Sequence, residues 1–292
     1  MTPKIDIDGI LASLRAEYSV SQELLANYFE RSFAPITNAI GLVRHQSVRS
    51  MLLDDLRPHP VVPCEIFLLA IDDEPSVETC IGGVPYRPAG IPWPCNLRGD
   101  EMQFLAQFRL DSHSGSSSYP GDIILVFVDH VNGIASDKAD SFCFEWYQLP
   151  YAADSTFNPL MTPWNRRAGV SYRTHDIDPS HMAQTVAQRL SRLFPEWDEF
   201  FLEMTTRHVL CYHAIKLGGI PVGTERPIGS RFLLSICSIS PRPEVPYPWM
   251  NHPSPITNDD ITDADIIDDR SGYGVDVFID DKNTLTWTLR YY

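Results

Sequence analysis

The sequence predicts an α+β protein in which helices pack on a mainly antiparallel sheet. Three observations lead to this prediction. Helical periodicity occurs near the N-terminus and again over residues 180–205, short apolar runs broken by proline and glycine follow residue 60, and one pattern of residues occurs twice. With 292 residues and 43% hydrophobic content, the chain is long enough to bury a full core.

The first 58 residues are predicted to form an N-terminal helical segment. Ile10, Leu11 and Leu14 recur at helical spacing, and Leu24 begins a second group of this kind. Pro58 then ends the helical pattern, because proline cannot continue a helix. We therefore expect a helical segment at 1–58 and an α+β domain at 59–292.

The α+β domain is expected to contain strands, an extended loop and two helices. Runs such as VVPCEIFLLA suit strands, whereas proline and glycine over residues 82–94 leave little possibility of helix. Met182, Val186 and Leu190 recur at helical spacing before Pro195 interrupts the pattern. Residues 180–205 are therefore predicted as two helices joined at this proline.

A weak internal repeat relates residues of about 80–130 to residues of about 216–290. Three short matches occur in the same order in both stretches: 82–85 (GGVP) with 218–221 (GGIP), 104–108 with 232–236, and 121–129 with 272–280. Each unit has a double-glycine turn followed by strands that are rich in β-branched and aromatic residues. We expect the two similar halves to pair into one larger sheet, because neither can bury a sheet alone.

Charge and hydropathy exclude several kinds of partner and location. The net charge of -15 argues against nucleic acid and against an anionic membrane surface, since both require a basic footprint. No apolar run is long enough to span a membrane. Asp6 and Asp8 lie where a secretory signal would have its apolar centre, so we expect a cytoplasmic protein with reduced cysteines.

No recognised catalytic, metal-binding or nucleotide-binding motif occurs in the chain. The sequence lacks HExxH, GxSxG, a P-loop and GxGxxG, and its six cysteines form no CxxC pair. We therefore expect no cofactor, no metal and no enzymatic activity. An enzyme of unrecognised type stays open as an alternative.

Two groups of residues are candidates for partner binding. Six aspartates lie within eleven residues near the C-terminus: Asp259, Asp260, Asp263, Asp265, Asp268 and Asp269. They are interpreted either as a solvated acidic loop or as a surface that docks on a basic protein. Trp93 and Trp249 lie between prolines and are interpreted as interface anchors or as packing residues of their loops.

The chain resembles the YwqG-like family, a bacterial domain-of-unknown-function family, in three motifs: GGVPYRPAGIPWP, MQFLAQFRL and YPGDIILVFVD. The later segments KLGGIP, RFLLSI and GYGVDVFIDDKNTLTW resemble its second half, so the resemblance covers roughly residues 60 to 290. After the GGIP turn the family usually has an aromatic residue and a glutamine, whereas this chain has VGTERP. The chain also has Ser235 where the family usually has a glutamine. The family has no established reaction, and some members resemble immunity proteins that neutralise bacterial toxins.

The resemblance and the acidic charge lead to one functional hypothesis. We expect a cytoplasmic immunity protein that neutralises a cognate secreted toxin, possibly a nuclease, by stoichiometric binding. The toxin would present a basic surface, because opposite charges favour association. The alternative is a small-ligand-binding or general interaction module without a toxin partner.

Overall fold

The computed structural model describes most of the chain beyond residue 58 and two residues before it. The described residues are 52–53, 59–71, 76–110, 119–129, 141–151, 153–154, 162, 164, 166–193, 195, 198–212, 214–221, 226–237 and 273–291. The predicted N-terminal helices lie outside this range except for Leu52 and Leu53, which are buried in an apolar cluster with Val186 and Leu190.

Within the described residues, strands occur from residue 61 onward, and the 3-10 helix η2 (Pro179–His181) precedes two α-helices. The strands are β1 (Val61–Ile71), β2 (Cys80–Ile81), β3 (Arg87–Pro88), β4 (Gln103–Arg109), β5 (Ile123–Val128), β6 (Phe142–Tyr147), β7 (Ala153–Asp154), β8 (Arg167–Ile177), β9 (Lys216–Gly218), β10 (Ser230–Cys237), β11 (Tyr273–Asp280) and β12 (Leu285–Tyr291). The α-helices are α4 (Ala183–Leu193) and α5 (Glu199–Leu210). Pro195 lies between them, as the sequence predicted.

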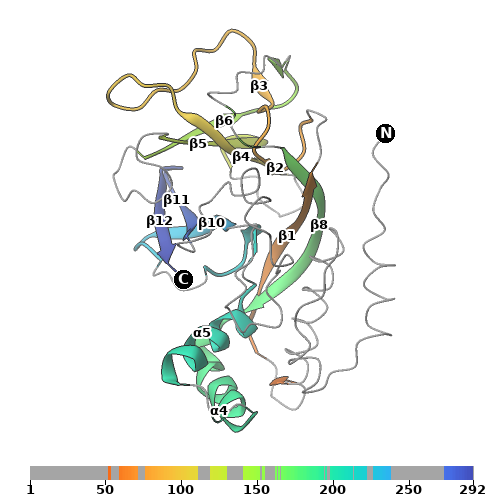
Figure 1. Cartoon of the computed structure of the whole chain (residues 1–292), viewed down its shortest axis with the longest axis vertical. Helices are drawn as coiled ribbons and strands as arrows, with labels where there is room; N and C mark the ends of the chain where they lie inside the picture. Colours follow the sequence, from red (N-terminus) through yellow and green to blue (C-terminus); the bar gives the residue numbers. More distant parts are fainter. Residues whose placement is uncertain are drawn as a thin grey trace, which may run out of the picture.

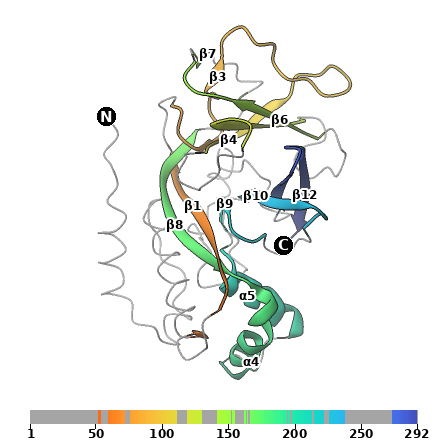
Figure 2. The same cartoon turned by 180° about the vertical axis from the view of Figure 1, so that it is seen from behind.

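Within the described residues, ten strands form one sheet in the order β12-β11-β10-β9-β1-β8-β2-β4-β5-β6. All of the pairs in this sheet are antiparallel. Its centre is the long pair β1–β8, whose register runs from Val61 opposite Ile177 to Ile71 opposite Arg167. Figures 1 and 2 show this pair as a curved ribbon that leads down to the helices. The predicted α+β class with a mainly antiparallel sheet is confirmed.

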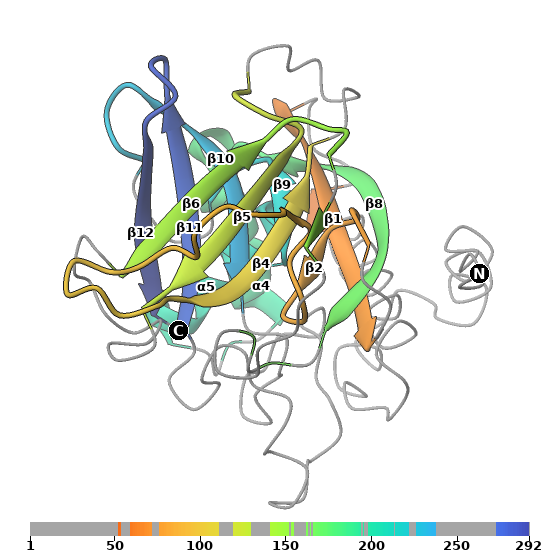
Figure 3. The same ribbon diagram turned by 90° about the horizontal axis from the view of Figure 1, so that it is seen from above.

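The sheet folds over, so that its two outer groups of strands face each other. Figure 3 shows the group β2-β4-β5-β6 lying over the group β9-β10-β11-β12. Leu105 and Val126 from the first group share one apolar core with Leu233 and Val277 from the second. The ring centroids of Phe142 on edge strand β6 and Trp287 on edge strand β12 lie 4.7 Å apart. Burial of both inner faces in one core stabilises the folded-over arrangement.

Two double-glycine turns end the shortest strands of the sheet. Gly82 and Gly83 follow β2 with φ of 65° and 72°, and Gly218 and Gly219 close β9 with φ of 65° and 82°. Residues with a Cβ adopt this left-handed conformation only at a cost, so glycine suits all of these positions. At Gly219 an added Cβ would also collide with the Asp176 carboxylate and lie 2.8 Å from Cβ of Cys64.

The substitution Gly219→Ala tests this close approach. Its matched control is Gly229→Ala, because Gly229 has φ of 77° and no atom within 4 Å of an added Cβ. The control is expected to lose about 1 to 2 kcal/mol of unfolding free energy from backbone strain alone. Gly219→Ala should lose roughly 3 kcal/mol or more, since strain and overpacking add. Urea denaturation measures both, and equal losses would contradict the collision.

Candidate functional site

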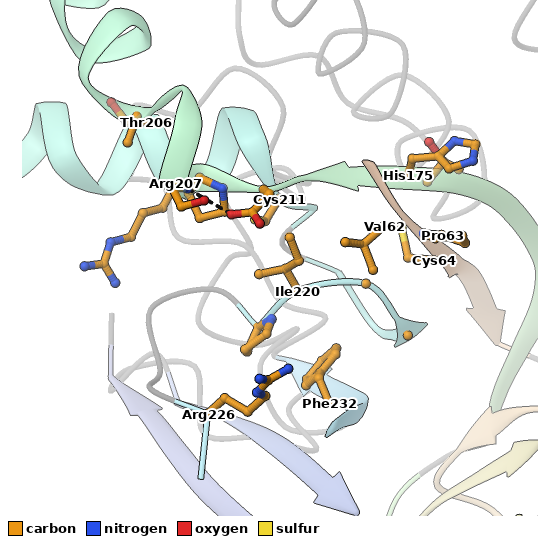
Figure 4. Close-up of a pocket in the computed structure, with 18 of the residues that line it drawn as sticks. Val62, Pro63, Cys64, His175, Thr206, Arg207, Cys211, Ile220, Arg226 and Phe232 are labelled. Atoms are coloured by element: carbon orange, nitrogen blue, oxygen red, sulfur yellow. Dashed lines mark hydrogen bonds between the residues drawn. The ribbon is translucent and has the colours of Figure 1, made fainter. Parts of the chain in front are cut away.

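A groove of about 1480 Å³ opens where the central strand pair meets the two helices. Its lining comes from the beginning of β1, the end of β8, one side of α4, one side of α5, the turn at residues 218–221 and the beginning of β10. Figure 4 shows helix α5 along one side of the groove, β10 along the other and Ile220 between them. Elements far apart in the sequence therefore build this groove.

The floor of the groove is apolar, and its rim is charged. Val62, Leu217, Ile220 and Phe232 contribute apolar side chains to the lining. The lining also has one histidine and eight acidic or basic residues: His175, Glu65, Arg173, Asp178, Glu199, Glu203, Arg207, Arg226 and Arg231. Protein–protein interfaces commonly have this anatomy of an apolar centre with a polar rim.

Helical periodicity explains which side of α4 borders the groove. Val186 and Leu190 are buried in the apolar cluster behind the helix. Ala183 and Ala187, which also are four residues apart, line the groove, and Ala183 packs against this cluster as well. Residues at this spacing share one helix face, so small side chains leave space along this wall.

A buried ion pair fixes the turn at residues 218–221 from below. Nζ of Lys216 lies 2.7 Å from Oδ2 of Asp176, and both side chains are almost completely shielded from solvent. Lys216 also donates to the carbonyl of Ile220, while the Ile220 N–H donates to Oδ2 of Asp176. The other carboxylate oxygen, Oδ1, accepts from the N–H of Tyr212. The pair thereby connects β8, the residues after α5, β9 and the turn.

The charge of Asp176 keeps Lys216 protonated in this interior. Burial lowers the pKa of the Lys216 ammonium, but the nearby Asp176 carboxylate and the Cys211 and Cys64 thiols raise it. The net result is a Lys216 pKa above its ordinary value of 10.5. Lys216 is therefore charged at neutral pH, and the hydrogen bonds of the pair satisfy polar groups that burial would otherwise penalise.

Arg226 and Arg173 are the two arginines of the lining without a hydrogen bond or ion pair in the described part of the chain, and Arg173 lies opposite Glu65 in the β1–β8 register. Figure 4 shows the side chain of Arg226 directed into the groove beside Phe232. Arg207, by contrast, pairs with Glu203 at 2.7 Å, and the guanidinium of Arg231 lies 4.6 Å from the ring centroid of Tyr119. Arg226 is exposed and makes no hydrogen bond or ion pair within the described part of the chain. It is therefore positioned to meet an anionic group that enters the groove.

A second polar cluster, on the strands β3 and β6, already has its partners. Arg87 forms two hydrogen bonds with Glu145, of 2.7 and 2.9 Å, and donates to the carbonyls of Ile91 and Pro92. The Tyr147 hydroxyl also donates to Glu145. Burial and this interaction raise the pKa of Tyr147 to about 12. The cluster fastens the proline-rich loop to the sheet, which is a structural role.

Trp93 belongs to this fastened loop and does not line the groove. Its indole N–H donates to the carbonyl of Met102, and its ring packs edge to face on Phe127 with centroids 5.3 Å apart. These contacts account for one of its two predicted roles, packing of the loop. Its role as a partner anchor stays a prediction, and the other predicted binding residues lie outside the described residues: Asp259, Asp260, Asp263, Asp265, Asp268, Asp269 and Trp249.

Sequence reasoning missed the residues that shape the groove. Lys216 and Asp176 are 40 positions apart in the chain, and although Lys216 begins the KLGGIP segment, nothing in that segment indicates an ion pair. Arg226 follows the GGIP turn in a stretch that differs from the first copy of the repeat. That difference between the two similar stretches was the one sequence signal that could have drawn attention to Arg226, because it marked a stretch found only in the second of them.

The described residues contain neither a cluster of metal ligands nor a membrane-spanning helix. No three His, Cys, Asp or Glu side chains come together there as ligands for a metal ion. None of the described helices has the length and apolar character required to cross a bilayer.

The chain belongs to the family described as "Domain of unknown function (DUF1963)", whose model matches residues 79–226. The match extends from the beginning of β2 through both helices and the 218–221 turn to Arg226. No curated protein matches the chain. The prediction of a domain-of-unknown-function family is confirmed at this level.

The variant Lys216→Met tests the ion pair. It leaves the Asp176 carboxylate buried without its counter-charge, which should cost about 3 to 5 kcal/mol of unfolding free energy at pH 7. Because the folded-state pKa of Lys216 is raised, the pair's contribution is fully present below the ordinary lysine value of 10.5 and is lost as pH rises through the raised value. Urea midpoints of wild type and variant should therefore differ at pH 7 to 10 and converge above this range.

The double variant Lys216→Met, Asp176→Asn serves as the control for Lys216→Met. It removes both charges and keeps an oxygen that can accept from one of the two backbone N–H groups. It should be more stable than Lys216→Met alone. A double variant that is less stable by the full sum of the single losses would contradict a coupled pair.

Proposed function

We propose that this protein is a binding protein that holds a segment of a partner polypeptide in the groove. The observation that carries the proposal is the size of the groove together with its lining. Small-molecule pockets usually enclose about 300 to 1,000 Å³, whereas this groove measures about 1480 Å³. An apolar floor with a charged rim suits a polypeptide, which brings apolar and charged side chains in alternation.

We further propose that the partner is a toxin and that the protein is its immunity protein. Three observations support this step: the net charge of -15, the membership of a domain-of-unknown-function family, and the resemblance of the sequence to the YwqG-like family. An acidic inhibitor is attracted to the basic surface that a nuclease needs for its phosphate substrate. Inhibition by stoichiometric binding requires no catalytic group in the inhibitor.

A small-ligand module without a toxin partner is the second candidate function. The concave shape of the groove and its convergent polar groups favour this alternative, since ligand sites share these features. A ligand of ordinary size would fill only part of the volume. The polypeptide proposal accounts for the whole groove and is therefore preferred.

We infer that the two groups of strands are copies of one unit, as the sequence repeat predicts. Both groups place a short strand before a double-glycine turn and then pair three strands in sequence. Both ladders shift register at the matching position, between Phe104 and Ala106 and between Phe232 and Leu234. Each group also has an edge-to-face ring pair at matching positions, Phe104 with Phe127 at 5.7 Å and Phe232 with Phe278 at 5.8 Å between ring centroids. These agreements support the duplication.

Cytoplasmic residence is part of the same proposal. Cys64, Cys80 and Cys211 are buried free thiols, and Cys95 is an exposed one. Thiols of this kind suit a reducing compartment.

The variant Ala187→Trp tests whether the groove binds the partner. Tagged full-length protein would be purified from its native host, and each recovered polypeptide would be produced alone and together with the tagged protein. Wild type should recover one basic polypeptide that stops growth alone and is harmless in co-production. Ala187→Trp should lose this recovery at least tenfold, because the indole projects from α4 into the groove and obstructs a bound segment.

Gln188→Trp is the matched control, since Gln188 is exposed on the same helix and does not line the groove. It should recover as much of the partner as wild type does. Circular dichroism of both variants verifies that α4 stays folded. If Ala187→Trp recovers as much partner as wild type, the partner binds outside the groove. If none of the recovered polypeptides stops growth when produced alone, the partner is not a toxin.

A further inference from the structure

Arg226 offers the groove an anion-recognition group, and this inference rests on the function proposed above. Its guanidinium points into the groove beside Phe232 (Figure 4). It makes no hydrogen bond or ion pair within the described residues. Arg207 lies against Glu203 and Arg231 against Tyr119, and Arg173 lies opposite Glu65 on the paired strand.

The surroundings of Arg226 strengthen an interaction with a carboxylate. Phe232 and Ile220 line the adjacent floor, so an occupant displaces water from this part of the groove. Charge-assisted hydrogen bonds are stronger in such surroundings because the effective dielectric constant is lower. A guanidinium also presents two parallel N–H donors, which match the two oxygens of one carboxylate.

We propose that Arg226 binds the side-chain carboxylate of an aspartate or glutamate in the partner segment. A neighbouring apolar side chain of the same segment packs on Ile220 and Phe232. The occupant is therefore a polypeptide segment in which one acidic residue adjoins an apolar one. Specificity then comes from Arg226, while the apolar floor supplies most of the affinity.

This local preference is opposite to that of the whole chain. A net charge of -15 attracts basic segments and repels acidic ones. Selection of an acidic residue at one position would consequently require a specific basic contact. The two effects are compatible in one partner that is basic overall and carries an acidic residue at the point of contact.

A peptide selection on the full-length protein tests the proposal. Random twelve-residue peptides displayed on phage have no free C-terminal carboxylate, so only side-chain carboxylates can be selected. Wild type should enrich peptides with aspartate or glutamate beside an apolar residue. Arg226→Glu should enrich lysine or arginine at the same position, because the charge that it presents is reversed.

The best peptide would then be synthesised with an amidated C-terminus and measured by fluorescence anisotropy. Replacing its acidic residue by the matching amide should weaken binding to wild type about tenfold. The same replacement should change binding to Arg226→Gln less than about twofold. Arg192→Gln, at an exposed position outside the groove, should retain the tenfold effect.

The outcomes separate this proposal from the proposed function. One outcome is a set of peptides that compete with one another, do not bind the Ala187→Trp variant and show no preference for an acidic residue. This outcome would overturn the role of Arg226 but leave the groove as a binding site. An acidic preference that persists on Arg226→Glu would also overturn that role. If every enriched peptide still binds the Ala187→Trp variant, or if no peptide is enriched, polypeptide binding in the groove is contradicted. Both proposals then fail.

Discussion

The buried pair of Lys216 and Asp176 determines the geometry on which the groove depends. Asp176 lies near the end of β8, and its carboxylate accepts from the backbone N–H groups of Tyr212 and Ile220 as well as from Lys216. Three segments that no short-range interaction would unite are thereby held within hydrogen-bond distance. Because the pair is out of contact with solvent, loss of either partner leaves a charge that water cannot stabilise. The position of Ile220 in the floor follows from this network.

The two groups of strands differ in what their loops do. The loop after the first double glycine lies on its sheet, where Trp93 packs on Phe127 and Arg87 is bound by Glu145. After the second double glycine, the described residues include Arg226, which faces the groove. The first loop therefore packs on the core, whereas Arg226 borders the candidate site. Loops of one fold can serve stability in one place and recognition in another.

Local sequence patterns were sufficient to predict some elements of this fold, but not the central strand β8 or the long-range contacts. The helices on both sides of Pro195 and strands such as β5 and β11 were recognisable from periodicity and β-branched residues. The pairing of β1 with β8 joins residues 96 to 116 positions apart, and no local signal encodes that register. Lys216 and Arg226 were missed for the same reason, since their roles depend on what the fold places around them. Trp93 could be placed only when Phe127 was known to lie beneath it.

Site-specific photo-crosslinking in the native host tests most directly whether the groove binds a partner. A photoreactive residue at Gln184, which is exposed and lines the groove, would be compared with the same residue at Gln188 on the neighbouring face. The account predicts that position 184 links to one peptide of one partner polypeptide and that position 188 does not. Equal links from both positions, or links from position 184 only to this chain itself, would contradict it.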